Sequence, residues 1–363
     1  MTSKQENGNR LSLVIEMMRF PLIVMVLYIH AISATRVPIE YNFSAKNIFI
    51  LLSETLSHNI FSIAVPCFFL FSGFFFFFKL KDTPKANWYK EQGLRRSKTI
   101  LIPYIIWNLA LVIAIIIKNG IFQIIGLGYD SGIDYIKSTS WSTIMWNDPI
   151  NFPLWYLRDL ICMTLLAPLF YIWLRFTRYI GIILLFIFYL SPLEINIPGF
   201  SSTAIFYYGL GAYMGIYKVD ILSFCNKRKQ WYYLLAAFLL IIAICTNGRE
   251  GHILVEKLFI PFGIICFFNI INRFVDNTKV RNFLCRMSPT VFFIYAIHEV
   301  YIYNWVNGFF VNNLNTYAAI GGILTYTLKP IIVLVISLMV YYITKKQTPQ
   351  LLNFMIGGRL TSK

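Results

Sequence analysis

The sequence predicts an all-α protein, a polytopic transmembrane helix bundle of about ten spans with both termini in the cytoplasm. Three observations support this prediction. The composition is 58% hydrophobic, with a mean hydropathy of +0.63, and soluble proteins of 363 residues are not this apolar. Apolar runs of membrane-crossing length recur along the whole chain. Lys and Arg gather in alternate connections between these runs.

The apolar runs are expected to form the spans in chain order. The run at 179–190 is short for a bilayer and is the least regular member of the series. The ten runs are 11–35, 57–78, 99–117, 154–174, 179–190, 201–217, 231–246, 253–271, 289–309 and 317–344.

The connections between the runs decide the predicted orientation. The segments before the first run, after every second run and at the end of the chain are rich in Lys and Arg, whereas the intervening connections are poor in them. The positive-inside rule therefore places both termini and every basic loop in the cytoplasm. Residues 1–363 then form a single membrane domain, with a cytoplasmic tail at 1–10, the longest outer connection at 118–153 and a basic cytoplasmic tail at 345–363.

The charge and the cysteines exclude other classes of protein. Thirty-two Lys and Arg stand against sixteen Asp and Glu, but their placement between apolar runs is a topology signal, and we expect no nucleic-acid partner. The six cysteines form no CxxC pair and no metal-ligand spacing with histidine. We therefore expect neither a disulfide framework nor a metal site.

The first apolar run carries an acid, a base and an imidazole. Glu16 and Arg19 are three residues apart and share a helix face. His30 follows Arg19 by eleven residues, which is about three turns with a drift of only ~20° and a rise of ~16 Å. Ionisable groups inside a membrane usually line a bundle interior or a cavity. Two interpretations follow: a functional site, or a polar network that ties helices together.

Further charged residues stand inside other runs. Because Arg158 and Asp159 are adjacent, they should point to different faces of a helix, and each should need its own partner on another helix. So many inward polar groups predict a wet or ligand-filled cavity. These residues are Arg158, Asp159, Glu256, Lys257, His298, Glu299 and Lys329.

The connection at 118–153 combines aromatic residues with aspartates, including Tyr135, Trp141 and Asp134. This pattern is compatible with sugar binding, because rings stack on sugar faces and carboxylates accept bonds from hydroxyls. A membrane-interface belt of aromatic residues explains the same pattern.

Several motifs, in order along nearly the whole chain, resemble the acyltransferase-3 family of membrane acyltransferases. The first is the acid, Arg and His of the first run. The others are the Phe-rich segment 65–74 ending in Ser72-Gly73-Phe74, the basic segment 95–104, the segment 154–157 with Trp155, and the segment 294–298 ending in His298. Glu16 stands where the family more often has Asp. We expect no C-terminal soluble hydrolase-like domain, which some members carry.

The resemblance implies a membrane-embedded O-acyltransferase that moves an acyl group, commonly acetyl from cytoplasmic acetyl-CoA, to a hydroxyl of a surface or lipid-linked glycan on the outer side. His30 would act with Arg19 and Glu16, as a general base or as a nucleophile that accepts the acyl group. The expected donor is acyl-CoA, without a metal. Its phosphates would bind Arg95, Arg96 and Lys98. The expected substrate-binding residues are Trp155, Arg158, Asp159 and His298.

The resemblance also implies a multi-pass protein of the cell membrane, as in a bacterial inner membrane, surrounded by lipid. A transporter or flippase of a glycan intermediate on the same scaffold is the alternative function. The sequence does not identify the acceptor, the acyl chain or the oligomeric state, and a homo-oligomer is compatible with it.

The predicted topology can be tested with single cysteines. Cysteine at Lys85, in a basic loop, should be shielded from an impermeant thiol reagent in intact cells, whereas cysteine at Asp134 should be labelled. Labelling at position 85 would reverse the orientation.

Overall fold

The chain folds into helices joined by short connections, and the computed structural model describes residues 3–40, 42, 44–80, 83–126, 131–193, 195–314 and 319–360. No strand occurs among these residues, which confirms the all-α class. Tyr129 and Asp130 of the 118–153 connection lie outside them.

The α-helices are α1 (Ser3–Ile29), α2 (Ala45–Ser53), α3 (Ala64–Phe77), α4 (Ala86–Arg96), α5 (Ile102–Ile124), α6 (Ser131–Ser138), α7 (Trp155–Leu165), α8 (Ala167–Thr177), α9 (Tyr179–Leu190), α10 (Ser202–Tyr217), α11 (Ile221–Lys227), α12 (Lys229–Thr246), α13 (His252–Phe274), α14 (Thr278–Met287), α15 (Val291–Ile297), α16 (Tyr303–Asn313), α17 (Ala319–Gln347) and α18 (Pro349–Met355).

Short helical turns of other pitch join several α-helices. Residues 54–63 join α2 to α3, and residues 97–101 join α4 to α5, so that each pair forms one continuous helix. The π-helical turns are η1 (Glu54–Ile60), η3 (Ser97–Leu101), η4 (Thr143–Asn147) and η7 (His298–Ile302), and the 3₁₀ turns are η2 (Phe61–Ile63), η5 (Phe152–Leu154) and η6 (Ser288–Thr290).

Six helices of the described chain are long and apolar enough to cross a membrane. A seventh candidate is the pair Phe152–Leu165 and Ala167–Thr177, which is bent by 60°. The structure thus supports a multi-pass membrane protein. The count of ten spans stays a prediction, because α9 is short and α10 has sixteen residues. The cytoplasmic placement of both termini also stays a prediction.

The apolar run at 289–309 does not form the one continuous helix that its length suggests. It is divided into α15, η7 and α16, and Tyr301 in η7 has φ +62°, a left-handed conformation that breaks the helix. The break follows His298 and Glu299 directly. Non-helical backbone at membrane depth is tolerated where protein or a cavity surrounds it. The break therefore marks this part of the chain as a candidate site.

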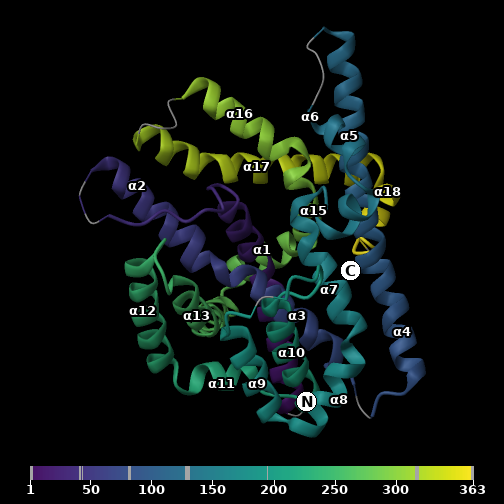
Figure 1. Ribbon diagram of the computed structural model, residues 1–363. Coiled ribbons are helices and arrows are strands. Elements are labelled where there is room, and N and C mark those ends of the chain that lie inside the picture. Colours follow the sequence, from purple (N-terminus) through teal and green to yellow (C-terminus); the bar gives the residue numbers. More distant parts are fainter. Residues whose placement is uncertain are drawn as a thin grey trace.

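The centre of the molecule is built by α1, α3 and α10 (Figure 1). The backbones of α3 and α10 touch, because glycines face each other across the contact. A Cβ atom on Gly73 would lie 2.1 Å from the Tyr208 carbonyl oxygen, and one on Gly211 would lie 2.0 Å from that of Leu70. Small residues allow membrane helices to approach in this way. Phe74 and Phe77 on α3 belong to the core, since both are fully buried.

A buried polar network fixes the chain just after α1. Arg36 pairs with Glu256 on α13 at 2.6 Å, and the Glu54 carboxylate accepts from the Asn247 amide at 2.8 Å. Glu54 also contacts His58 at 2.7 Å. Paired and hydrogen-bonded charges avoid the cost of burying them alone. The network therefore anchors the end of α1 against α2, α12 and α13.

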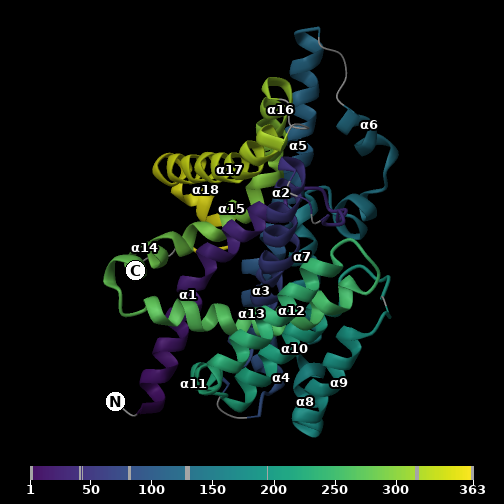
Figure 2. The same cartoon turned by 90° about the vertical axis from the view of Figure 1, so that its left-hand side faces the viewer.

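The helices α16 and α17 lie at the opposite end of the molecule from α8, α9 and α11, as both views show (Figures 1 and 2). After α17 the chain turns back, and α18 packs against α5 and α17. The Trp107 indole donates to the Met355 carbonyl at 3.0 Å. The C-terminal tail is thereby held against the start of α5.

Replacing Gly73 by Ala should destabilise the protein by about 1–3 kcal/mol, because the added methyl group overlaps the α10 backbone. Thermal unfolding of the purified protein in detergent measures this loss. Gly120→Ala on α5 is the matched control, since no atom lies within 4 Å of its Cβ position. Equal melting temperatures for the two variants would contradict the close α3–α10 contact.

Candidate functional site

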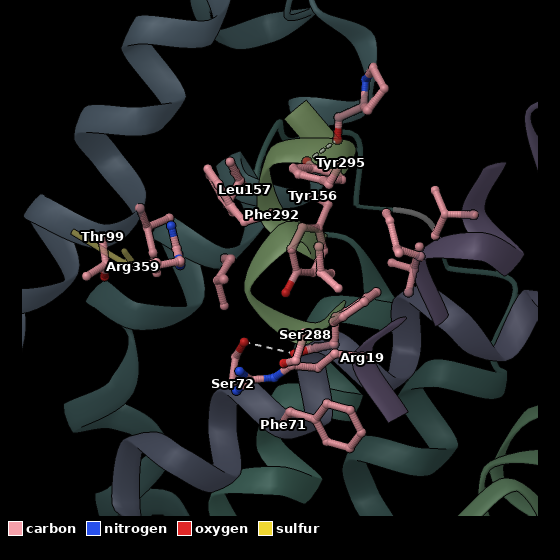
Figure 3. Close-up of a pocket in the computed structure, with 18 of the residues that line it drawn as sticks. Arg19, Phe71, Ser72, Thr99, Tyr156, Leu157, Ser288, Phe292, Tyr295 and Arg359 are labelled. Carbon is pink, nitrogen blue, oxygen red and sulfur yellow. Dashed lines mark hydrogen bonds between the residues drawn. The ribbon is translucent and has the colours of Figure 1, made fainter. Parts of the chain in front are cut away.

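A cavity of about 570 Å³ lies between the central helices and the C-terminal tail. Its walls come from α1, α3, the α4–η3 junction, η5 and α7, the η6–α15 segment and residue Arg359. Figure 3 shows Tyr156 and Tyr295 at one end of the close-up, Arg19 and Ser72 at the other, and Arg359 with Thr99 on one side. A cavity of this size holds a cofactor-sized ligand.

The polar stripe of α1 faces this cavity, as the spacing predicted. Glu16, Arg19 and His30 all line it, with Ile23 and Val26 between the last two. Glu16 lies close enough to attract Arg19 electrostatically. His30 follows the last helical residue of α1. The three side chains therefore point toward one cavity, as their spacing predicted, although His30 lies one residue past the end of the helix.

His30 lies against the broken segment after α15. Its ring centre is 5.2 Å from that of His298, and its Nδ1 atom is 3.8 Å from Oε1 of Glu299. Lys329 on α17 is close enough to act on both His30 and Glu299 electrostatically, and its ammonium lies over the Tyr303 ring. The Tyr303 hydroxyl donates to the Leu27 carbonyl, which ties α16 to the end of α1. The site thus combines two imidazoles, a carboxylate and an ammonium.

His298 has a defined tautomer. Its Nδ1 atom is 2.8 Å from the Tyr295 carbonyl oxygen and 3.2 Å from that of Ile294. Carbonyl oxygens only accept hydrogen bonds, so Nδ1 carries the proton. The buried Nε2 atom is then an acceptor, and it has no hydrogen-bond partner in the described part of the chain.

The nitrogen and oxygen atoms of His30, His298 and Glu299 could also surround a cation, since one ligand atom from each lies within 4.8 Å of the others. The nearby Lys329 ammonium acts against a bound cation. The expectation that no metal is used stays a prediction.

The basic side chains divide into two groups. Arg19, Arg96 and Arg359 line the cavity, whereas Arg95 and Lys98 are exposed and do not. Of the three residues predicted to hold donor phosphates, only Arg96 therefore reaches the cavity. On a helix, residues one or two positions from Arg96 point to other faces.

Trp155 lines the cavity, but Arg158 and Asp159 do not. These two charges pair with each other at 3.0 Å, which the expected separation onto different helix faces did not foresee, and each also bonds another element as expected. Arg158 is long enough to fold back onto its neighbour, and it also donates to the Trp146 and Asn147 carbonyls. The second Asp159 oxygen accepts from the Ser201 amide. The pair thus joins the 118–153 connection and the start of α10 to α7.

Sequence reasoning missed two groups of cavity residues. Tyr156 and Tyr295 lie within the segments 154–157 and 294–298 that resemble the family, but they were not expected to be site residues, and Ser288 carries no distinctive spacing. Arg359 lies in the basic tail, where positive charge is read as a topology signal. Glu299 stood out as an intramembrane acid, but its pairing with His30 was visible only in the fold.

The fold and the cavity define a class: an all-helical, multi-pass membrane protein with a polar site among its helices. The sequence model of a family described as an acyltransferase domain matches residues 13–342. The chain belongs to the acyltransferase-3 family. The resemblance seen in its motifs is thus confirmed.

The chain is also similar to a curated protein, the succinoglycan biosynthesis protein ExoH of Rhizobium meliloti (strain 1021). The two are 27% identical over 173 residues, which cover 46% of this chain and 44% of that protein. The chain therefore spans less than half the length of this relative. No solved structure gives a significant match.

The structural role of the Arg158–Asp159 pair can be tested by Asp159→Asn. The change leaves the mostly buried Arg158 without its counter-charge and should lower the free energy of unfolding by about 3 kcal/mol in the ligand-free protein. Denaturation in detergent measures it. The exposed Asp134→Asn is the control, and an unchanged stability for Asp159→Asn would contradict the structural role of the pair.

Proposed function

We propose that the protein is a membrane-embedded O-acyltransferase that moves an acyl group, in the first instance acetyl from acetyl-CoA, to a hydroxyl of a surface or lipid-linked glycan. One observation carries this proposal: a single cavity holds an imidazole and three guanidiniums. The family supports the acyl transfer, and the relative named for succinoglycan biosynthesis supports a polysaccharide acceptor.

The guanidiniums suit the donor. Arginine binds phosphate oxygens through two parallel hydrogen bonds, so Arg19, Arg96 and Arg359 could hold the phosphates of acyl-CoA. Between these residues and His30 the cavity is lined by apolar side chains, among them Ile23 and Val26. This apolar lining suits the extended pantetheine arm of acyl-CoA, which would carry the thioester toward His30.

His30 suits the proton transfer. In the general-base mechanism, its unprotonated Nε2 takes the proton of the acceptor hydroxyl as the oxygen attacks the thioester carbon. The carbon–sulfur bond then breaks, and the imidazolium returns the proton to the thiolate leaving group. In the alternative mechanism the imidazole attacks first and carries the acyl group to the acceptor. Both mechanisms need a neutral imidazole facing the cavity.

Glu299 is placed to orient this imidazole. A carboxylate on Nδ1 holds the proton there and leaves Nε2 as the basic atom. The present separation of 3.8 Å exceeds a hydrogen bond, so the side chains would close or share a water when substrate binds. Glu299 is thus proposed as a positioning residue rather than a catalytic one.

The orientation proposed for the reaction follows the topology prediction. The donor would enter from the cytoplasmic side and the acceptor from the outer side, with His30 between them. The surrounding lipid and the bacterial inner membrane are part of the same proposal.

Replacing His30 by Ala or by Gln should lower kcat for glycan acylation by at least about 10²-fold, because neither side chain can carry the proton. Transfer of labelled acetyl from acetyl-CoA, with mass spectrometry of the glycan, measures the rate. Gln retains hydrogen-bonding capacity, so it separates chemistry from helix packing.

The control is His252→Gln, a histidine outside the cavity, which should keep its activity when the protein remains folded. Near-normal acylation by the His30→Gln variant would show that His30 only ties helices together. Glycan transport without acylation by the unchanged protein would favour the transporter alternative.

A further inference from the structure

The cavity holds an excess of partly buried positive charge. Three guanidiniums line it, from α1, from the last turn of α4 and from the C-terminal tail, whereas Glu16 is the one carboxylate among its lining residues in the described chain. Burial, together with the charges of Arg19 and Arg96, lowers the pKa of Arg359 to about 9. Arg19 and Arg96 therefore lie close enough to Arg359 for the like charges to repel. Such an arrangement is stabilised by a bound anion.

A hydrogen-bonded turn that contains two glycines holds Arg359 in place. Gly357 has φ +70°, and its Cβ position lies 2.8 Å from the Lys98 carbonyl oxygen, so another residue would fit poorly in this turn. Gly358 donates to the Asn353 carbonyl at 2.7 Å, and the Asn353 side chain accepts from the Leu360 amide at 3.0 Å. The buried Leu352 anchors α18 to the core. The tail is thus fixed on both sides of Arg359.

Contacts with neighbouring residues also fix the orientation of the Arg359 guanidinium. Its Cζ atom lies 3.9 Å from the centre of the Phe292 ring, and one of its nitrogens donates to the Ile356 carbonyl. Arg359 lines the cavity, as do the hydroxyl-bearing residues Thr99 and Ser288 (Figure 3). Guanidinium groups bind phosphate and carboxylate oxygens alike, and three of them around one cavity match the charge of two adjoining phosphates better than that of one carboxylate.

From this geometry we propose that Arg359 of the C-terminal tail completes, with Arg19 and Arg96, a binding site for the diphosphate group of the substrate. The tail is then part of the substrate site and not only a topology signal. The inference rests on the proposed function for the identity of the diphosphate ester. Two sources share this chemistry: the nucleotide end of acyl-CoA and a polyprenyl diphosphate that carries the glycan.

The test measures binding of coenzyme A and of a short-chain polyprenyl diphosphate to the full chain in detergent. Arg359→Gln should raise the Kd of the diphosphate ligand about 10- to 100-fold, the worth of a hydrogen bond to a charged group. Arg359→Lys should give a smaller loss, because Lys offers a point charge. Lys346→Gln, which removes an exposed charge near the end of α17, should leave the Kd unchanged.

Each outcome is decisive. Tight coenzyme A binding that weakens in Arg359→Gln supports the inference and the donor assignment together. Weakening for the polyprenyl diphosphate alone supports the diphosphate site and moves it from donor to acceptor. Equal affinities of Arg359→Gln and the unchanged protein for both ligands overturn the inference while the proposed function stands. Binding of neither ligand overturns both.

Two further measurements guard against a folding defect and against contacts elsewhere in the ligand. Inorganic pyrophosphate should displace coenzyme A from the unchanged protein, and a failure to compete would overturn the diphosphate site without any variant. Pantetheine, which lacks the diphosphate, should bind the unchanged protein and the Arg359→Gln variant equally. A selective loss of pantetheine binding would instead show that the substitution deforms the cavity.

Discussion

The cost of placing charge inside a membrane is the constraint on which the rest of this structure depends. An uncompensated ionised side chain at the centre of a bilayer costs several kcal/mol, so it must face protein, water or a ligand. The polar stripe of α1 therefore dictates a cavity beside that helix. The remaining helices pack around the stripe, with α3 and α10 in backbone contact behind the cavity and α15 and the tail closing it.

The other buried charges meet the same constraint without a cavity. Arg158 and Asp159 neutralise each other, while Arg36, Glu256, Glu54 and Asn247 form a network near the end of α1. The cavity differs from both, because Glu16 is the one carboxylate among the described residues that line it, against three guanidiniums. Networks in which every charge has a partner hold helices together. The uneven charge of the cavity instead fits the ligand site proposed above.

The broken segment after α15 completes the site through backbone geometry. The left-handed Tyr301 ends the regular helix and leaves His298 and Glu299 beside His30. Carbonyls of α15 fix the tautomer of His298. A strained, irregular segment thus supplies the polar partners of a histidine that lies just past the end of a regular helix, and strained backbone of this kind is common at functional sites.

The sequence by itself determined the all-α membrane class, the shared face of Glu16, Arg19 and His30, and the family. These features depend on composition and on spacing within one helix, where 3.6 residues per turn suffice for the prediction. Only the tertiary structure decided which distant groups meet: Glu299 and His298 with His30, Arg96 rather than Arg95 in the cavity, and Arg359 from the tail. It also decided that Arg158 and Asp159 pair, because a long side chain can fold back onto its neighbour. Contacts between helices depend on how far each rotates and bends, as in the 60° bend after α7, and neither quantity is encoded in a local pattern.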